Sequence, residues 1–235
     1  MNLVDLSGPW PGTLLAGRIR RAENRGRLPR ANQCHGDVLP ERRTRLGYGL
    51  RPVERESDKM SAGAFYNPAD PGLVAKRARA RVLTRRLSEG HKGVLHELLG
   101  AVGSEVDIVP PFFCDYGTNI FMGSRVFLNT NCVILDSARV EIGDDVQIGP
   151  AVHLYAVTHP LDPQVRRTGL EQAAPVTIGS GVWLGGGTIV CPGVTIGMET
   201  TIGAGSVVVA DIPSRVLAAG NPCRVIRPID ATDRG

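Results

Sequence analysis

Aliphatic residues recur at every sixth position near the C-terminal end of the chain. They are Ile178, Leu184, Val190, Ile196, Ile202 and Val208. Glycine directly follows four of them, at 179, 185, 197 and 203, and a small or β-branched residue fills the fifth position of each repeat. A period of six fits neither an α-helix nor a half-buried strand, which repeat about every 3.6 and 2 residues. The pattern predicts a parallel β-helix in which each sixth side chain points into the axis of a triangular prism.

Two shorter blocks carry the same period earlier in the chain. The spacing runs through Ile120, Val126, Cys132 and Ala138, and then, after a slip of four, through Ile142, Ile148 and Leu154. Independent short strands of a β-sandwich are the alternative, but a sandwich shows alternation and hairpin turns rather than a sixfold spacing. We therefore expect a mainly β protein built from hexapeptide repeats.

The repeat is interrupted between Leu154 and Ile178. This stretch contains prolines at 160, 163 and 175 and charged residues such as Arg166 and Glu171. Such a composition predicts a loop extruded from the coil, and long loops on rigid scaffolds often carry function.

A section of helical composition, residues 62–103, precedes the coil. Its apolar positions suggest one buried stripe: Leu73, Val74, Val82, Leu83 and Leu87. Asp70 and Pro71 are suited to the N-cap and first turn of a helix. We expect this short N-terminal helical section to cover the open first coil, which otherwise exposes strand edges and apolar core.

The charge of the chain is unevenly distributed. Residues 1–57 contain eleven arginines and six acidic residues, a net +5, whereas the whole chain carries +4. This Gly-, Pro- and Arg-rich stretch has no sustained period, and we expect residues 1–58 to be disordered or a non-native extension, with Met60 as the natural first residue. A nucleic-acid-binding tail is the alternative, but interleaved aromatic residues are nearly absent.

Composition excludes several other classes. No run approaches the roughly 18 apolar residues needed to span a bilayer, and the N-terminus lacks a signal-peptide core. The five cysteines show no CxxC pairing, so reduced thiols in a cytoplasmic protein are the simplest interpretation. We expect no bound metal, no membrane partner and no nucleic-acid partner.

Five motifs together resemble the maltose/galactoside O-acetyltransferase family and its nodulation sugar acetyltransferase relatives. They are AGAFY at 62–66, CDYGTNIFMG at 114–123, THPLDP at 158–163, PVTIGSGVWLGGG at 175–187 and GNPCRVIR at 220–227. The resemblance covers residues 59–229. It implies a helical acceptor-side section over 59–104, a left-handed parallel β-helix over 105–229 and a short tail to 235. It also implies a homotrimer with active sites between subunits, which transfers acetyl from acetyl-CoA to a sugar hydroxyl.

His159 is the expected general base. A sugar hydroxyl is a poor nucleophile at neutral pH, and histidine is the usual group that removes its proton. His159 stands at the mouth of the extruded loop, in the THP motif. His153 precedes the inward position Leu154, and we expect a structural role for it. Direct transfer in a ternary complex is favoured, because no serine or cysteine sits in a recognisable triad.

The acceptor is expected to be held by polar residues at corners of the coil and in the helical section. By resemblance these are Asn129, Asp115, Asp136, Tyr66 and Arg77. Asn and Asp also occupy such corners simply because they tolerate turn geometry. Family members often carry a different residue where this chain has Pro68, which points to a difference in acceptor recognition.

The coenzyme is expected along the glycine-rich coils, where backbone without a Cβ lets a ligand approach closely. Gly186 and Ala204 match family positions, Trp183 is expected to pack nearby, and Arg224 and Arg227 are suited to phosphates. For Gly185 a tight corner is the better interpretation. Relatives commonly show Thr-Lys where Val209 and Ala210 stand, which weakens phosphate binding at this end.

Alternative functions remain open from the sequence. One is an acetyltransferase that acts on serine or an antibiotic, and another is a non-catalytic β-helix scaffold. A zinc hydratase of the same coil type needs three converging histidines, and only His153 and His159 fall within the coil region.

Overall fold

The computed structural model describes residues 55–234. The expectation of a disordered or non-native segment over 1–58 therefore lies outside the described residues, except at its last four positions. Of these, residues 56–58 belong to helix α1 (Glu56–Ser61), so the proposed boundary at 58 falls inside a helix.

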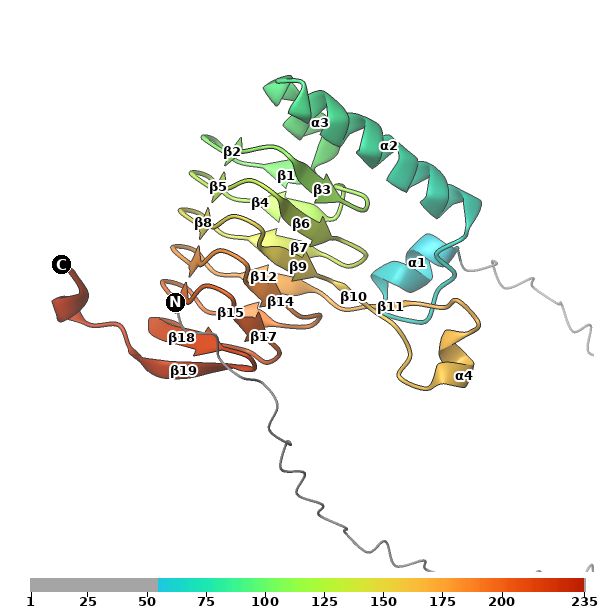
Figure 1. The fold of residues 1–235 in the computed structure, drawn as a ribbon. Coiled ribbons are helices and arrows are strands. Elements are labelled where there is room, and N and C mark those ends of the chain that lie inside the picture. Colours follow the sequence, from blue (N-terminus) through green and yellow to red (C-terminus); the bar gives the residue numbers. More distant parts are fainter. Residues whose placement is uncertain (1–54, 235) are drawn as a thin grey trace, which may run out of the picture. The chain divides into compact units, whose positions relative to one another are not determined.

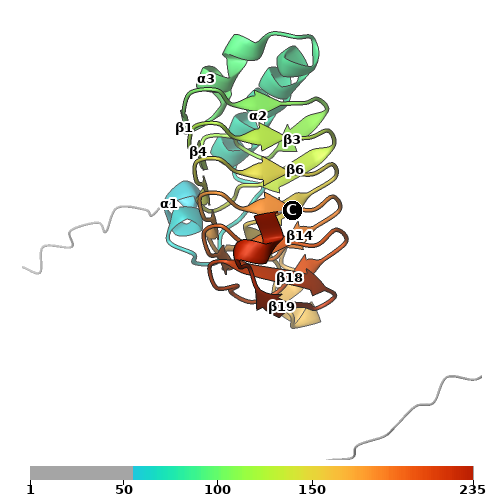
Figure 2. The same cartoon turned by 90° about the vertical axis from the view of Figure 1, so that its left-hand side faces the viewer.

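Three parallel sheets form the faces of a prism (Figures 1 and 2). The first face contains β1 (Ala101–Val102), β4 (Ile120–Met122), β7 (Val140–Ile142), β12 (Val176–Ile178) and β15 (Thr195–Ile196). The second contains β2 (Asp107–Ile108), β5 (Phe127–Leu128), β8 (Gln147–Ile148), β13 (Trp183–Leu184), β16 (Thr201–Ile202) and β18 (Val216–Gly220), with β19 (Cys223–Pro228) added antiparallel. The third contains β3 (Phe112–Cys114), β6 (Cys132–Leu135), β9 (His153–Tyr155), β14 (Ile189–Val190) and β17 (Val207–Val208).

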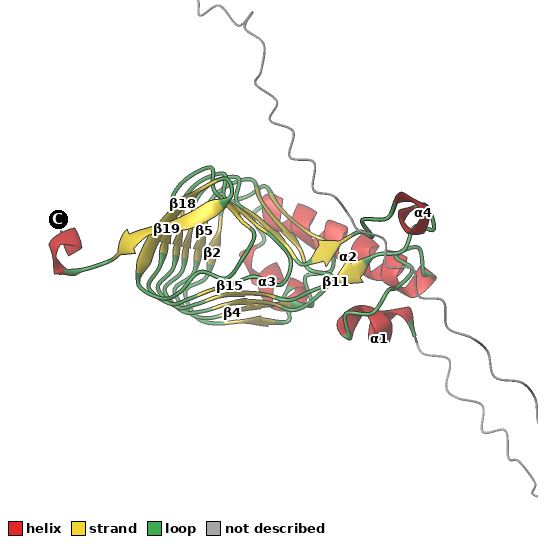
Figure 3. Cartoon of the chain, turned by 90° about the horizontal axis from the view of Figure 1, so that it is seen from below, coloured by secondary structure: helices red, strands yellow, loops and turns green. Residues whose placement is uncertain are grey.

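The coil is left-handed, as expected. In Figure 1 the chain descends from β1 toward β18. In Figure 3, seen from below, it passes clockwise from the first face to the second and then to the third while approaching the viewer. Two corners of the prism carry most of the predicted site residues. The glycine corner, between the second and third faces, comprises residues 129–131, 149–151, 185–187 and 203–205. The loop corner, between the third and first faces, comprises residues 115–119, 136–139, 156–175 and 191–194.

The inward positions of the coil are those that the sixfold spacing predicts. Leu184 pairs in register with Ile148 on one side and Ile202 on the other, so equivalent side chains stack along the axis. All the inward positions from Ile120 to Val208 are buried, Leu184 and Ile202 with none of their surface exposed. The fifth positions are buried as well, including Thr188 and Thr200. The prediction of a parallel β-helix is confirmed.

The helical section contains α1, α2 (Pro71–Ser88), η1 (Lys92–Val94) and α3 (Leu95–Leu98). Asp70 caps α2 as predicted, because its carboxylate accepts the backbone N–H groups of Gly72 and Leu73. The predicted stripe is only partly correct: Leu73, Leu83 and Leu87 are buried, but Val74 and Val82 are about half exposed. Ala80 and Thr84 are buried in their place, on a helix that packs against β3.

The coil begins earlier than expected. Strand β1 starts at Ala101 and pairs with β4, so the boundary between the helical section and the coil lies four residues before residue 105. Helix α3 packs against β1 and α2 against β3, and Lys92 of η1 pairs with Asp107 of β2. The helical section thus contacts strands of all three faces in the first coil.

The extruded loop is present where it was predicted. It contains β10 (Val157–Thr158) and β11 (Gln172–Ala173), which pair antiparallel, and the short helix α4 (Pro163–Arg166) between them. Beyond β19 the chain ends in η2 (Ala231–Arg234). Within residues 55–234 no helix has both the length and the apolar character to cross a membrane.

Candidate functional site

His159 lies at the base of the extruded loop, immediately after β10. Its side chain is 57% exposed, and Nε2 lies 4.0 Å from Oε1 of Glu171. A histidine in this position is accessible to a substrate and has a carboxylate beside it. Both properties suit a proton acceptor.

Glu171 is a residue that sequence reasoning did not single out for the site. It precedes β11, and its backbone forms an isolated antiparallel bridge with Tyr66, with N···O distances of 3.0 and 3.1 Å. The Tyr66 hydroxyl also donates to Oε2 of Glu171 at 2.6 Å. Glu171 is therefore held in place from the helical section, 105 residues away in the chain, and no local signal could have indicated the contact.

Tyr66 does not fit the predicted contact with the acceptor. Its side chain is completely buried, and its hydroxyl is bonded to Glu171. Burial, reinforced by the hydrogen bond to Glu171, raises the pKa of Tyr66 far above its ordinary value. Tyr66 therefore remains a neutral donor, and its geometry suits a positioning residue rather than a substrate ligand.

A cavity of about 450 Å³ lies between α2 and the loop corner. It is lined by Pro68, Ala69, Val74, Arg77, Arg81, Asp115, Tyr116, Ser137 and Glu171. Two of the predicted acceptor residues, Arg77 and Asp115, thus share one cavity with Glu171. Its size is in the range of small-molecule sites.

Arg77 is fixed in this cavity by two hydrogen bonds. It donates to the hydroxyl of Tyr116 at 2.7 Å and to the backbone oxygen of Pro68 at 2.6 Å. Burial raises the pKa of the Asp115 carboxyl, and Arg77 partly opposes this shift. The cavity therefore presents carboxylates, hydroxyls and a guanidinium that together can pair with several hydroxyl groups.

Asp136 does not fit the predicted role either. It has no exposed surface, and its carboxylate accepts the backbone N–H groups of Tyr116 at 2.8 Å and Asn119 at 3.3 Å. Burial raises its pKa to about 7 despite these two bonds. Asp136 shapes the turn that carries Asp115 and Tyr116, while its neighbour Ser137 lines the cavity.

Asn129 and the predicted coenzyme residues lie together at the glycine corner. Asn129, Gly186 and Ala204 lie just after β5, β13 and β16 of the second face, and the coil of β8 lies between the first two. A Cβ on Gly185 would lie 2.5 Å from the backbone nitrogen of Ala204, so this position admits only glycine, as expected for a tight corner. Gly186 is partly exposed and Ala204 exposed, so the corner offers accessible backbone to a ligand.

Trp183 and the C-terminal arginines border this corner. Trp183 projects from the second face with 55% of its surface exposed. Arg224 lies opposite Ala219 in the β18–β19 hairpin, and within residues 55–234 its side chain bonds only the backbone oxygen of Cys223. Arg227 instead forms a two-point ion pair with Asp233, at 2.7 and 2.5 Å. Arg224 is therefore the more available of the two for phosphate.

The candidate site residues fall into two groups that one chain does not bring together. His159, Asp115 and Glu171 are at the loop corner with Arg77 of α2 beside them, whereas Asn129, Gly186 and Ala204 are at the glycine corner. The third face separates the two corners, and its outward side chains include Phe113, 57% exposed.

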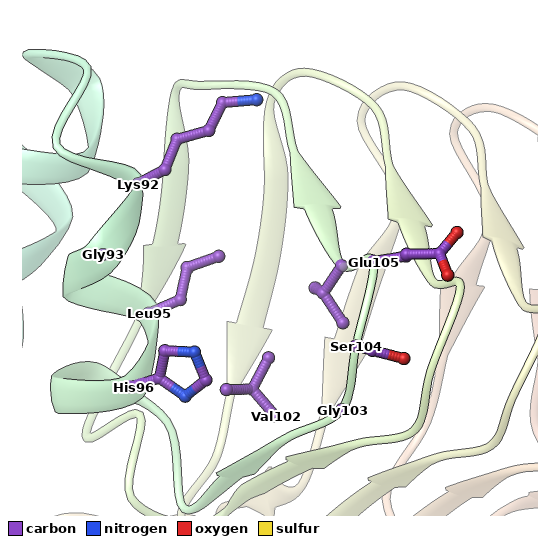
Figure 4. Close-up of a pocket in the computed structure, with 9 residues that line it drawn as sticks. Lys92, Gly93, Leu95, His96, Val102, Gly103, Ser104 and Glu105 are labelled. Atoms are coloured by element: carbon purple, nitrogen blue, oxygen red, sulfur yellow. The ribbon is translucent and has the colours of Figure 1, made fainter.

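A further cavity and other polar contacts lie outside these two corners. A cavity of about 610 Å³ opens at the first coil, between Leu95 and His96 on one side and Val102 and Ser104 on the other (Figure 4). It contains none of the motif residues, and Lys92 at its edge is paired with Asp107 at 2.7 Å. His153 bonds the hydroxyl of Tyr155 through Nδ1 at 2.7 Å. Among residues 55–234, no three His, Cys, Asp or Glu side chains gather as metal ligands would.

Two family models match the chain. The maltose acetyltransferase hexapeptide capping motif matches residues 59–103, and the bacterial transferase hexapeptide with six repeats matches residues 175–210. The first covers the helical section and the second the most regular coils, in agreement with the two parts of the fold.

Known proteins resemble this chain over nearly their whole lengths. Nodulation protein L of Rhizobium leguminosarum bv. viciae is 49% identical over 177 residues, which cover 72% of this chain and 93% of that protein. A maltose O-acetyltransferase structure from Clostridium difficile is 43% identical, with a TM-score of 0.73 over 74% of this chain and 97% of its own. A galactoside acetyltransferase in complex with coenzyme A is 37% identical, with a TM-score of 0.74 over 77% and 94%. The chain belongs to the maltose/galactoside O-acetyltransferase family of hexapeptide-repeat acetyltransferases.

Proposed function

We propose that this protein transfers acetyl from acetyl-CoA to a hydroxyl of a sugar, with His159 as general base. The observation that carries the proposal is the arrangement at the loop corner. An exposed histidine lies 4.0 Å from Glu171, and Glu171 also lines a polar cavity of about 450 Å³. His159 itself does not line the cavity, and Glu171 links the two, so the acetylated hydroxyl is placed at the Glu171 end of the cavity. The relatives named for maltose and galactoside acetylation support this acceptor class.

The transfer has two steps: the acceptor oxygen attacks the thioester, and the tetrahedral intermediate then collapses. His159 removes the proton of the acceptor hydroxyl as its oxygen attacks the thioester carbonyl. The tetrahedral intermediate then collapses, the carbon–sulfur bond breaks, and the coenzyme A sulfur leaves with the proton from His159. Glu171 stabilises the imidazolium formed between the two steps, because it places a negative charge beside the ring.

A covalent acetyl-enzyme is not required. Cys114, Cys132 and Cys223 are buried and Cys191 is partly buried, and burial raises the pKa of each of these thiols. A thiol of raised pKa supplies little thiolate for nucleophilic attack. Direct transfer in a ternary complex is the simpler mechanism.

Acetyl-CoA is assigned to the glycine corner. The accessible backbone of Gly186 and Ala204 suits the amide-rich pantetheine arm, and the exposed ring of Trp183 and the guanidinium of Arg224 suit the nucleotide end. The relative solved with coenzyme A supports this donor. A cytoplasmic location agrees with such a donor.

The active site is proposed to form between two copies of the chain in a homotrimer. The proton acceptor and acceptor cavity lie at the loop corner, whereas Asn129 and the coenzyme positions lie at the glycine corner of the same prism. If the loop corner of one copy meets the glycine corner of the next, both groups converge. Threefold closure would give three equivalent sites.

The test is release of free thiol from acetyl-CoA against a panel of sugars, for the wild type and His159→Ala. Sugar-dependent release should fall by about 10²–10⁴ in the variant. His91→Ala is the matched control, because His91 is also exposed but lies in the helical section outside the cavity. Equal activity of wild type and His159→Ala would remove His159 as the base. If serine or an antibiotic is acetylated and no sugar is, the acceptor is not a sugar. If no acceptor is acetylated at all, the result favours a non-catalytic scaffold.

A further inference from the structure

A second cavity continues the acceptor cavity along α2. It has a volume of about 370 Å³ and is lined by Arg81, Thr84, Arg85, Ser88, Phe112 and Phe113. Arg81 lines both cavities. The two therefore adjoin in one groove between α2 and β3, longer than a single sugar ring requires.

Three arginines follow this groove at helical spacing. Arg77, Arg81 and Arg85 are four residues apart, so they lie on one side of α2 and span about 12 Å along its axis. Arg77 is committed to Tyr116 and Pro68. Arg81 and Arg85 are exposed, and neither guanidinium makes a hydrogen bond or close ion pair with any of residues 55–234. Arg81 acts on the Asp115 carboxylate at a longer distance.

The charge of α2 is not compensated within the helix. Residues 71–88 contain six basic residues and no acidic residue. Like charges four residues apart on a helix repel one another and destabilise the helix. A bound anion between Arg81 and Arg85 would relieve this repulsion and gain charge-assisted hydrogen bonds.

The two ends of the groove differ in charge. Asp115 and Glu171 lie at the end near His159, and Arg85 lies at the other end with the exposed ring of Phe113 opposite. A neutral, hydroxyl-rich unit suits the carboxylate end, and a negatively charged unit suits the arginine end. The groove therefore has a direction: the acetylated sugar sits by His159, and an anionic group extends toward Arg85.

We infer that the acceptor is an acidic glycan of at least two units, whose unit beyond the acetylated sugar carries an anionic group bound by Arg81 and Arg85. This inference rests on the proposed function for the position of the acetylated sugar. The anion is a uronate carboxylate or a sulfate or phosphate ester, since each offers oxygens that a guanidinium binds at two points. Phe113 provides an apolar surface for the ring that bears the anion.

The test compares acceptors that differ only in the distal unit. Three disaccharides share one glucose unit, and their second unit is glucose, glucuronate or a sulfated glucose. The measurement is kcat/KM for thiol release from acetyl-CoA, with direct binding of each disaccharide by calorimetry as the second readout. For the wild type we expect kcat/KM to be about tenfold higher for at least one acidic disaccharide than for the neutral one. Comparison of the glucuronate disaccharide with the sulfated one shows whether the site prefers a carboxylate or a sulfate ester.

Arg85→Gln is the diagnostic variant, because Arg85 lines only the second cavity. The ratio of kcat/KM for acidic over neutral acceptor should fall about tenfold, and binding of the acidic disaccharide should weaken to the same degree. Lys76→Gln is the control: Lys76 is an exposed cation of α2 outside both cavities, and its loss should leave the ratio unchanged. The preference should also weaken at about 0.5 M salt, where exposed charges are screened.

The outcomes separate this inference from the proposed function. Transfer to the neutral disaccharide with no preference for either acidic one, and an unchanged ratio in Arg85→Gln, would overturn the inference and leave the function standing. Binding of an acidic disaccharide that depends on Arg85, without acetyl transfer to any sugar, would overturn the function and leave the anion site standing. If the ratio of kcat/KM for acidic over neutral acceptor falls equally in Lys76→Gln and Arg85→Gln, the preference arises from the overall charge of α2. That result would overturn the assigned site.

Discussion

The core of the coil and the loop corner differ in how their contacts relate to the sequence. In the core, Leu184 meets Ile202, a residue eighteen positions later that occupies the same place in the repeat. At the loop corner, Glu171 is held by Tyr66, which is 105 residues away and shares no pattern with it. The core is periodic and buried, whereas the corner is irregular and partly exposed.

This difference separates stability from chemistry. Buried aliphatic side chains in stacked coils stabilise the prism through burial of apolar surface. The residues that face the cavity contribute polar groups whose value depends on their arrangement. Substitutions in the core should therefore act on unfolding, and substitutions at the loop corner should act on turnover.

The largest effect on stability is expected from truncation of an inward side chain. Leu184→Ala should lower the free energy of unfolding by about 2–5 kcal/mol, because it leaves a cavity in a closely packed core. The matched change is Leu161→Ala in the extruded loop, where the side chain is 93% exposed. That variant should stay within about 0.5 kcal/mol of the wild type. Urea unfolding at fixed protein concentration measures both, and similar losses would contradict the comparison.

Asp136 should make stability depend on pH. Burial raises its folded pKa to about 7, above the ordinary value of 3.8, so its contribution is fully present below about pH 4 and is lost as pH rises toward 7. Between those values the wild type should lose about 2–4 kcal/mol relative to Asp136→Asn, and above pH 7 the difference should be constant.

Unfolding of both proteins at intervals from pH 4 to 8 measures this difference. Asp145→Asn is a suitable control, because Asp145 is an exposed carboxylate paired with Arg125, and its pKa is lowered rather than raised. A pH-independent difference between wild type and Asp136→Asn would contradict the prediction.

The smallest effect is expected from removal of the charge on Glu171. Glu171→Gln keeps an oxygen that can accept the Tyr66 hydroxyl and removes the carboxylate beside His159. We expect kcat to fall about tenfold, equivalent to about 1.4 kcal/mol, while the unfolding midpoint stays unchanged. Steady-state kinetics and thermal unfolding measure the two quantities. A drop in the midpoint with no loss of kcat at low temperature would assign Glu171 a structural role only.

The fold could be predicted almost completely, for a local reason. The six-residue period of the aliphatic residues is visible within short stretches of the chain. Each inward position from Ile120 to Val208 follows from this spacing. The cap of α2 at Asp70 was also predictable, because it depends only on adjacent residues. The errors at Val74 and Val82 arose because a helical stripe predicts that one side is buried but not where its edges lie, and β3 decides those edges.

The structure brings some of the predicted acceptor residues together and not others, and their roles stay predictions. Arg77 and Asp115 line one cavity, while Tyr66 and Asp136 are buried. Sequence alone does not separate a carboxylate that faces a cavity from one that accepts backbone N–H groups, because both suit a corner of the coil. The partners of Asp136 are the amides of Tyr116 and Asn119, one coil earlier in the chain.

The sequence by itself determined the coil, its inward positions, the place of the extruded loop and the family to which the chain belongs. These properties depend on spacing and motif order, which are local. The tertiary structure decided which distant side chains meet: Glu171 with His159 and Tyr66, and Arg81 and Arg85 beside Phe113. These contacts depend on how segments far apart in the chain pack together. That packing depends on the shapes of all the helices, strands and loops involved.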